Sequence, residues 1–183
     1  MRTKKDIQAG FTLPELLVAI VIFLMVVGSA STLMISAAAA QRRALAVQEL
    51  VGQTSYLSEY MSRQIRQARK ETNQGCLSQQ GRSYDLTHGS QGLKFINSLN
   101  QCHEFFLDGG RIKEIRGTQE QYLTPDDTLV TTLNFFISGA TDADTLQPKG
   151  SVFFNLQTKG ERPESISSLS LQTTISQRSF DVQ

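Results

Sequence analysis

The sequence lacks the features by which most enzymes and nucleic-acid-binding proteins are recognised. Its 18 lysine and arginine residues are almost balanced by 17 aspartate and glutamate residues, which gives a net charge of +1. That balance excludes the large basic excess that is typical of nucleic-acid-binding proteins. The chain also has no glycine-rich phosphate loop, no nucleophile elbow and no pair of carboxylates spaced for catalysis. With 183 residues it is too short for a two-domain enzyme, and has room for one ordinary domain plus an N-terminal element.

Cysteine and histidine are both scarce. The two cysteines, Cys76 and Cys102, lie in the C-terminal part and form no CxxC motif. His88 and His103 lie near them, but this mixed set lacks the spacing of zinc ligands, so we expect no metal site. If this part of the chain lies outside the cytosol, we expect a disulfide between the cysteines, which would contribute about 3 to 4 kcal/mol. Two unpaired buried thiols are the alternative.

Charge is absent from a long stretch near the N-terminus. The 20 residues from Leu16 to Ile35, "LLVAIVIFLMVVGSASTLMI", contain none, and this length matches the roughly 20 residues that a helix needs to cross a bilayer. One carboxylate, Glu15, stands directly before this run. A carboxylate near an apolar core costs about 2.5 kcal/mol or more unless it is neutralised or paired, so Glu15 is a functional candidate. If the chain is cut before Phe11, the new amino group lies roughly 6 Å from Glu15 along a helix axis.

The segment "GFTLPELLVAI" resembles the class III leader motif of type IV prepilins and pseudopilins. The motif has Gly before the cut, Phe after it, then Thr, Leu, a variable position, Glu and an apolar run. The matching residues here are Gly10, Phe11, Thr12, Leu13, Pro14 and Glu15. The resemblance implies that prepilin peptidase cuts after Gly10 and that Phe11 is then N-methylated. It also implies that Glu15 pairs with the Phe11 amine of a neighbouring subunit during assembly, and that the chain is a substrate and not an enzyme, with no cofactor.

Two more ordinary interpretations of the N-terminus compete with this one. A conventional secretory signal would have its apolar core from Leu16 to Val27 and a small-residue site ending at Ala30, so that a secreted β-rich binding domain would begin at Ser31. A plain signal anchor is the second. Both leave Glu15 unexplained. Pro14 favours the prepilin cut, because proline is tolerated in the first helical turn that would begin at Phe11.

The helical pattern continues beyond the apolar run. The stretch from Ser36 to Glu71 is rich in strong helix formers and contains no proline, so we predict a single helix from about Phe11 to about Lys70. Steps of three and four place one set of residues on a face that we expect to pack under a head: Val47, Leu50, Thr54, Leu57, Met61, Ile65 and Ala68. The opposite side carries Glu49, Glu59, Arg63, Arg66 and Arg69. This charged side is typical of a solvated helix face, and contact with DNA or acidic lipids is the alternative.

After Glu71 the pattern becomes turn-rich and then alternates as in β-strands. We expect strands at 93–99, 104–107, 111–116, 128–138, 151–158 and 168–176. Asp108, Gly109 and Gly110 predict a hairpin turn. The sequence therefore predicts an α+β, pilin-like fold, in which a long N-terminal helix packs against an antiparallel β-sheet head. The acidic loop "TDADT", with Asp142 and Asp144, lacks an EF-hand pattern and is interpreted as solvated.

The expected organisation has four parts. Residues 1–10 are a cleaved cytoplasmic leader, 11–35 a transmembrane and filament-core helix, 36–70 its amphipathic continuation, and 71–183 the head. Three basic residues in the leader agree with this orientation, which places the head outside the cytoplasm.

The resemblance implies a minor pilin or minor pseudopilin. Such a subunit is anchored in the cytoplasmic membrane before assembly. It then forms part of a cell-surface or periplasmic filament, either a pilus or a type II secretion pseudopilus. Its partners would be prepilin peptidase, the inner membrane and other pilin subunits. A competence pilus subunit that contacts DNA through Arg63, Arg66, Arg69 and Lys70 is an alternative.

Overall fold

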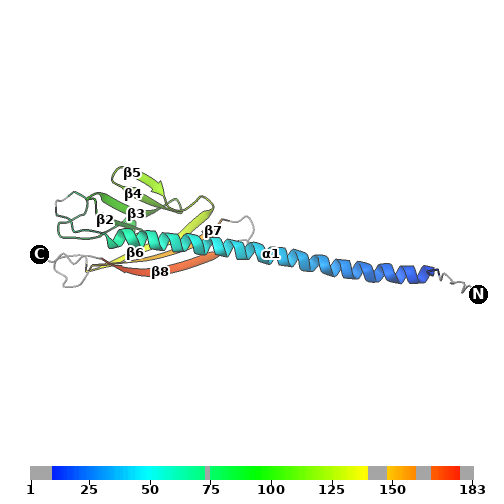
Figure 1. The fold of residues 1–183 in the computed structure, drawn as a ribbon. Helices are drawn as coiled ribbons and strands as arrows, with labels where there is room; N and C mark the ends of the chain where they lie inside the picture. Colours follow the sequence, from blue (N-terminus) through cyan, green and yellow to red (C-terminus); the bar gives the residue numbers. More distant parts are fainter. Residues whose placement is uncertain (1–9, 73–74, 140–147, 160–165, 178–183) are drawn as a thin grey trace, which may run out of the picture. The chain divides into compact units, whose positions relative to one another are not determined.

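The computed structural model describes residues 10–72, 75–139, 148–159 and 166–177 (Figure 1). In these residues one α-helix, α1, extends from Leu13 to Arg66, and eight strands and a short 3-10 helix, η1 (His88–Ser90), follow it. The chain divides into two compact units, residues 1–42 and 43–183, which are described separately below. The leader residues before Gly10 lie outside the described part of the chain, as do Asp142 and Asp144 of the acidic loop.

The described residues of the first unit, 10–42, are all exposed, and from Leu13 onward they form the N-terminal part of α1. This part of the helix is long and apolar enough to cross a membrane by length and composition. Its hydroxyl groups are bonded within the helix: the Oγ atoms of Ser29 and Ser31 donate to the carbonyls of Val26 and Val27, each at 2.8 Å. Because each of these hydroxyl protons has an acceptor one turn back, the two hydroxyl groups need no water as an acceptor.

The second unit covers one face of the C-terminal part of α1. The buried helical residues are Leu50, Thr54, Leu57, Met61 and Ile65. They belong to the predicted face, and Ala68, just beyond the helix, is buried with them. Val47 was predicted to share this face but is 47% exposed. Leu50 is the first buried residue of the helix.

Helix α1 ends four residues before the predicted Lys70 because other elements bind its last backbone groups. The Tyr84 hydroxyl donates to the Ile65 carbonyl at 2.9 Å, and the Gln177 side-chain amide donates to the Ala68 carbonyl at 2.7 Å. The Arg69 N–H donates to the Ile96 carbonyl at 2.9 Å, in an isolated antiparallel bridge. These partners satisfy groups that would otherwise be orphaned at a helix end, and they turn the chain toward the sheet.

Five short strands form the first antiparallel sheet, in sequential order. They are β1 (Asp85–Thr87), β2 (Gly92–Ile96), β3 (Cys102–Asp108), β4 (Arg111–Arg116) and β5 (Gln119–Tyr122). The predicted hairpin between β3 and β4 is confirmed: Asp108 pairs with Arg111, and Gly109 and Gly110 have φ of 56° and 79°. Positive φ at both loop residues gives a twist that matches the flanking strands. The sequence did not predict β1 or β5, which have three and four residues.

A second antiparallel sheet has three longer strands, β6 (Thr128–Ser138), β7 (Lys149–Thr158) and β8 (Ser168–Ser176). The predicted antiparallel β-sheet head after a long helix is confirmed, and the head consists of two sheets where the sequence predicted one. Both sheets lie alongside the C-terminal half of α1 (Figure 1). One hydrophobic cluster unites the helix with the two sheets, with Met61 from α1, Phe105 from β3 and Phe154 from β7 among its fully buried members.

Candidate assembly segment and head surface

The predicted processing site lies at the beginning of α1. Gly10 and Phe11 precede the helix, and the Phe11 side chain is 79% exposed. The Thr12 carbonyl accepts the Leu16 N–H at 3.1 Å, which fixes the first turn. Pro14 is the second helical residue, a position where its missing N–H removes no helical hydrogen bond. The two residues that flank the predicted cleavage site, Gly10 and Phe11, are thus both exposed.

Glu15 is exposed in the first turn of α1. Among the described residues its one hydrogen-bond partner is the Thr12 hydroxyl, which donates to Glu15 Oε2 at 3.4 Å. A single weak neutral donor does not balance a carboxylate in an apolar environment. The helix N-terminus offers partial compensation, since its dipole favours negative charge there.

The head contains a buried polar network that the sequence did not reveal. Glu114 of β4 is 1% exposed and faces α1, from which the Tyr60 hydroxyl donates to its Oε1 at 2.7 Å. The fully buried His103 donates from Nε2 to the same oxygen at 2.5 Å, and Arg116 contacts it at 3.0 Å. The Gln121 amide donates to Glu114 Oε2. The network joins three strands to the helix.

Ionisation of Glu114 depends on these donors. Burial raises the pKa of this carboxyl, but hydrogen bonds from His103, Tyr60, Gln121 and Arg116 outweigh burial and lower the pKa from 4.5 to about 2. The Tyr60 phenol shifts in the opposite direction: burial and the hydrogen bond to the Glu114 carboxylate raise the pKa of Tyr60. A signal was available in the sequence, since alternation in "RIKEIR" places Glu114 on the same side as the core residue Ile112.

The cysteines form a disulfide between the segment after α1 and the first residue of β3. Their Cα atoms are 5.5 Å apart. The two histidines lie in different surroundings: His103 is in the buried network, whereas the His88 ring stacks on Phe106 with 4.5 Å between centroids. No group of three or more potential metal ligands occurs in the part of the chain that the structure describes.

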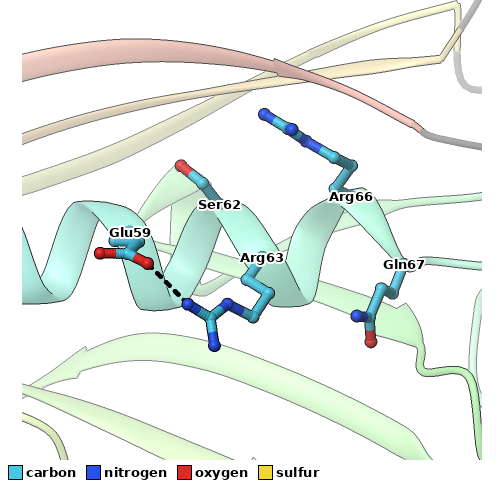
Figure 2. A pocket seen from close by; sticks show the side chains of 5 residues that line it. All are labelled: Glu59, Ser62, Arg63, Arg66 and Gln67. Carbon is cyan, nitrogen blue, oxygen red and sulfur yellow. Dashed lines mark hydrogen bonds and ion pairs between the residues drawn. The ribbon is translucent and has the colours of Figure 1, made fainter.

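The basic residues at the end of α1 do not converge on one site. Arg63 and Arg66 help to line a shallow pocket of about 290 Å³ (Figure 2). Arg63 Nη2 lies 2.6 Å from Glu59 Oε1, and Figure 2 shows the Arg63 and Arg66 side chains pointing away from each other. Arg69 donates to the Asn100 side-chain oxygen at 3.4 Å. Arg63, a predicted DNA-contacting residue, is therefore paired with a carboxylate.

Comparison with protein families identifies the N-terminal segment. Residues 5–31 match the family described as the prokaryotic N-terminal methylation motif. No curated protein and no solved structure matches the chain. The motif is the signature of prepilin-type proteins, and the long apolar helix followed by antiparallel sheets is a pilin-like architecture. Together they are consistent with a type IV pilin-like protein, a class of structural subunits.

Proposed function

We propose that this chain is a minor pilin or minor pseudopilin of an extracytoplasmic filament. The observation that carries the proposal is an apolar helix that no described residue covers and whose first turns lie within the methylation motif. An exposed apolar surface of this size is not stable in water. It requires lipid before assembly and the helices of other subunits afterwards, so the same residues serve both states.

Gly10 supports processing by prepilin peptidase. A Cβ atom added at Gly10 would meet no heavy atom within 4 Å, and the residue does not need positive φ. The fold itself therefore gives no reason for glycine at this position. We attribute the residue to recognition by an enzyme that must approach the backbone closely, with cleavage after Gly10 and N-methylation of Phe11.

Glu15 supports a role in subunit assembly. In the uncleaved chain its described partner is one hydroxyl. Cleavage creates a charged amino group at Phe11, about one helical turn away, and an opposite charge favours the ionised carboxylate. Pairing of Glu15 with the Phe11 amine of a neighbouring subunit balances both charges inside an apolar filament core. The pair would select subunits and set their axial register, because any other register leaves a buried unpaired charge.

The subunit is proposed to be anchored by one pass in the cytoplasmic membrane, with its head outside. The disulfide between Cys76 and Cys102 supports this orientation, since disulfides persist in oxidising compartments. Its partners are then prepilin peptidase, other pilin subunits and the membrane.

The mass of the mature protein tests the processing step. The intact protein, purified from membranes, is expected to begin with N-methylated Phe11. Gly10→Ala is expected to leave the leader attached. Gly28→Ala is the matched control, because it changes another open glycine of the same segment and should be processed normally. A mature protein that begins at Ser31 would overturn the proposal in favour of a conventional signal peptide.

The assembly role needs a separate measurement. Glu15→Ala is expected to be processed normally but to be lost from sheared filaments, whereas Glu49→Ala, an exposed carboxylate in the second half of α1, is expected to be incorporated. Incorporation of both variants at the wild-type level would show that the proposed charge pairing is wrong.

A further inference from the structure

The outer face of the three-stranded sheet is almost free of charge. In β6, β7 and β8 the only charged residue is Lys149, at the first position of β7. Protein surfaces ordinarily carry charge on about a quarter to a third of their positions. Most outward positions here carry hydroxyl and amide side chains instead, while the inward positions supply the core. We use the name neutral face for the outward side of these three strands.

Hydroxyl and amide groups of the neutral face are linked across the strands. The Thr131 hydroxyl donates to Asn155 Oδ1 at 3.0 Å, and Asn155 Nδ2 donates to the Ser170 hydroxyl at 2.7 Å. The hydroxyls of Ser151 and Thr174 share a bond of 2.9 Å. These bonds fix the rotamers of the side chains. They leave some hydrogen-bonding positions of the hydroxyls unused, because each hydroxyl has one donor and two acceptor positions. The groups are therefore preorganised for a polar ligand.

Two phenylalanines lie among these polar groups. Phe136 pairs with Ser151 across the ladder and is 57% exposed. Phe153 pairs with Asn134, which makes the two phenylalanines diagonal neighbours on the same side of the sheet, at a typical separation of about 7–8 Å. The face thus presents adjacent aromatic rings with hydrogen-bonding groups around them.

This combination is complementary to one ligand chemistry. A pyranose ring has an apolar C–H face that packs on an aromatic ring and hydroxyls at its rim that exchange hydrogen bonds with hydroxyls and amides. Nucleic acids and acidic glycans require cations, and Lys149 is the single one in these strands. A cationic partner would require carboxylates, which the three strands lack.

We propose that the neutral face binds an uncharged polysaccharide, with sugar rings on Phe136 and Phe153 and ring hydroxyls bonded to residues such as Asn155. The binding function concerns the head alone and does not depend on the proposed filament assembly. It would give an extracytoplasmic subunit the capacity to attach to a neutral glycan surface.

Titration calorimetry on the full chain in detergent micelles tests the proposal. The probes are cellohexaose, xylohexaose and maltohexaose, with hexagalacturonate as the anionic counterpart. At least one neutral hexasaccharide is expected to bind with a Kd below about 1 mM, and hexagalacturonate is expected to bind at least tenfold more weakly. Phe136→Ala and Asn155→Ala are each expected to weaken binding at least tenfold.

Tyr122→Ala is the matched control, because it removes an exposed aromatic ring from the five-stranded sheet and should leave binding unchanged. Circular dichroism of each variant verifies that the head remains folded. Three results would overturn the proposal: no binding of any neutral probe, equal binding by the Phe136→Ala variant, or stronger binding of the anionic probe. Self-association abolished by Phe136→Ala, without glycan binding, would instead identify the neutral face as an interface between copies of the chain.

Discussion

The two halves of α1 are both rich in apolar residues, but they use them differently. In the first half the apolar residues occur on every side of the helix and all are exposed, whereas in the second half Leu50, Leu57, Met61 and Ile65 lie on one face that the head buries. An all-round apolar helix needs an apolar solvent, and a one-sided helix needs a single covering layer. The distribution of apolar residues around the helix therefore determines which half belongs to membrane or filament and which belongs to the folded head.

The largest expected difference between the halves concerns loss of a large apolar side chain. Met61 is fully buried, so Met61→Ala is expected to lower the free energy of unfolding of the head by about 2–5 kcal/mol through lost burial and a residual cavity. Leu24→Ala, in the first half, is expected to leave this value unchanged because Leu24 is exposed and is not a member of the head's core cluster. Urea unfolding of full-length protein in detergent, followed by tyrosine fluorescence, measures both. Equal losses would contradict the division of roles.

The disulfide is expected to have the next largest effect. It closes a loop between positions separated by 26 residues, which corresponds to about 3 to 4 kcal/mol of stabilisation in the chain-entropy account. Replacing both cysteines by serine, or reducing the bond, is therefore expected to destabilise the head by this amount. Helicity of the first half should not change, because the bond joins segments of the second unit. Comparing far-ultraviolet circular dichroism with the head's unfolding transition separates the two effects.

Acid is expected to weaken the second half through Glu114. Its pKa in the folded protein is about 2, below the ordinary 4.5, so the ionised carboxylate stabilises the folded state. This stabilisation is fully present above about pH 4.5 and is lost as the pH falls toward 2, by up to about 3 kcal/mol for a shift of this size. Unfolding measured between pH 6 and pH 2 should show the loss, and Glu114→Gln should remove most of it. If the free energy of unfolding of the Glu114→Gln variant fell with pH as steeply as that of the wild type, the acid effect would belong to other carboxylates.

Local pattern predicted most of this fold, but it did not predict how the strands associate. The bounds of β4, β6 and β8 match their predictions because alternation of side chains is a property of each strand alone. β5, with the polar sequence QEQY and four exposed residues, exists through its pairing with β4. The separation into two sheets likewise depends on contacts between distant segments, which no short stretch encodes.

The same distinction explains which site residues could be recognised. The prepilin motif is one contiguous segment of the chain, so it can be recognised from the sequence alone. The network around Glu114 assembles from α1, β3, β4 and β5, and its members are ordinary polar residues until the fold brings them together. The neutral face could not be predicted from a short stretch of sequence, because its distinguishing feature is a shortage of charged residues across three strands.

The smallest expected effect compares two glycines of α1. Gly28 lies in the first half and Gly52 in the second, and a Cβ atom at either would meet no heavy atom within 4 Å. Gly52→Ala is expected to stabilise the head by up to about 1 kcal/mol, because alanine loses less conformational freedom in a helix and adds no clash. Gly28→Ala improves helix propensity equally but should leave unfolding of the head unchanged. If Gly28→Ala stabilised the head as much as Gly52→Ala, the two halves of α1 would unfold as one cooperative unit, and the boundary near Arg42 would have no thermodynamic meaning.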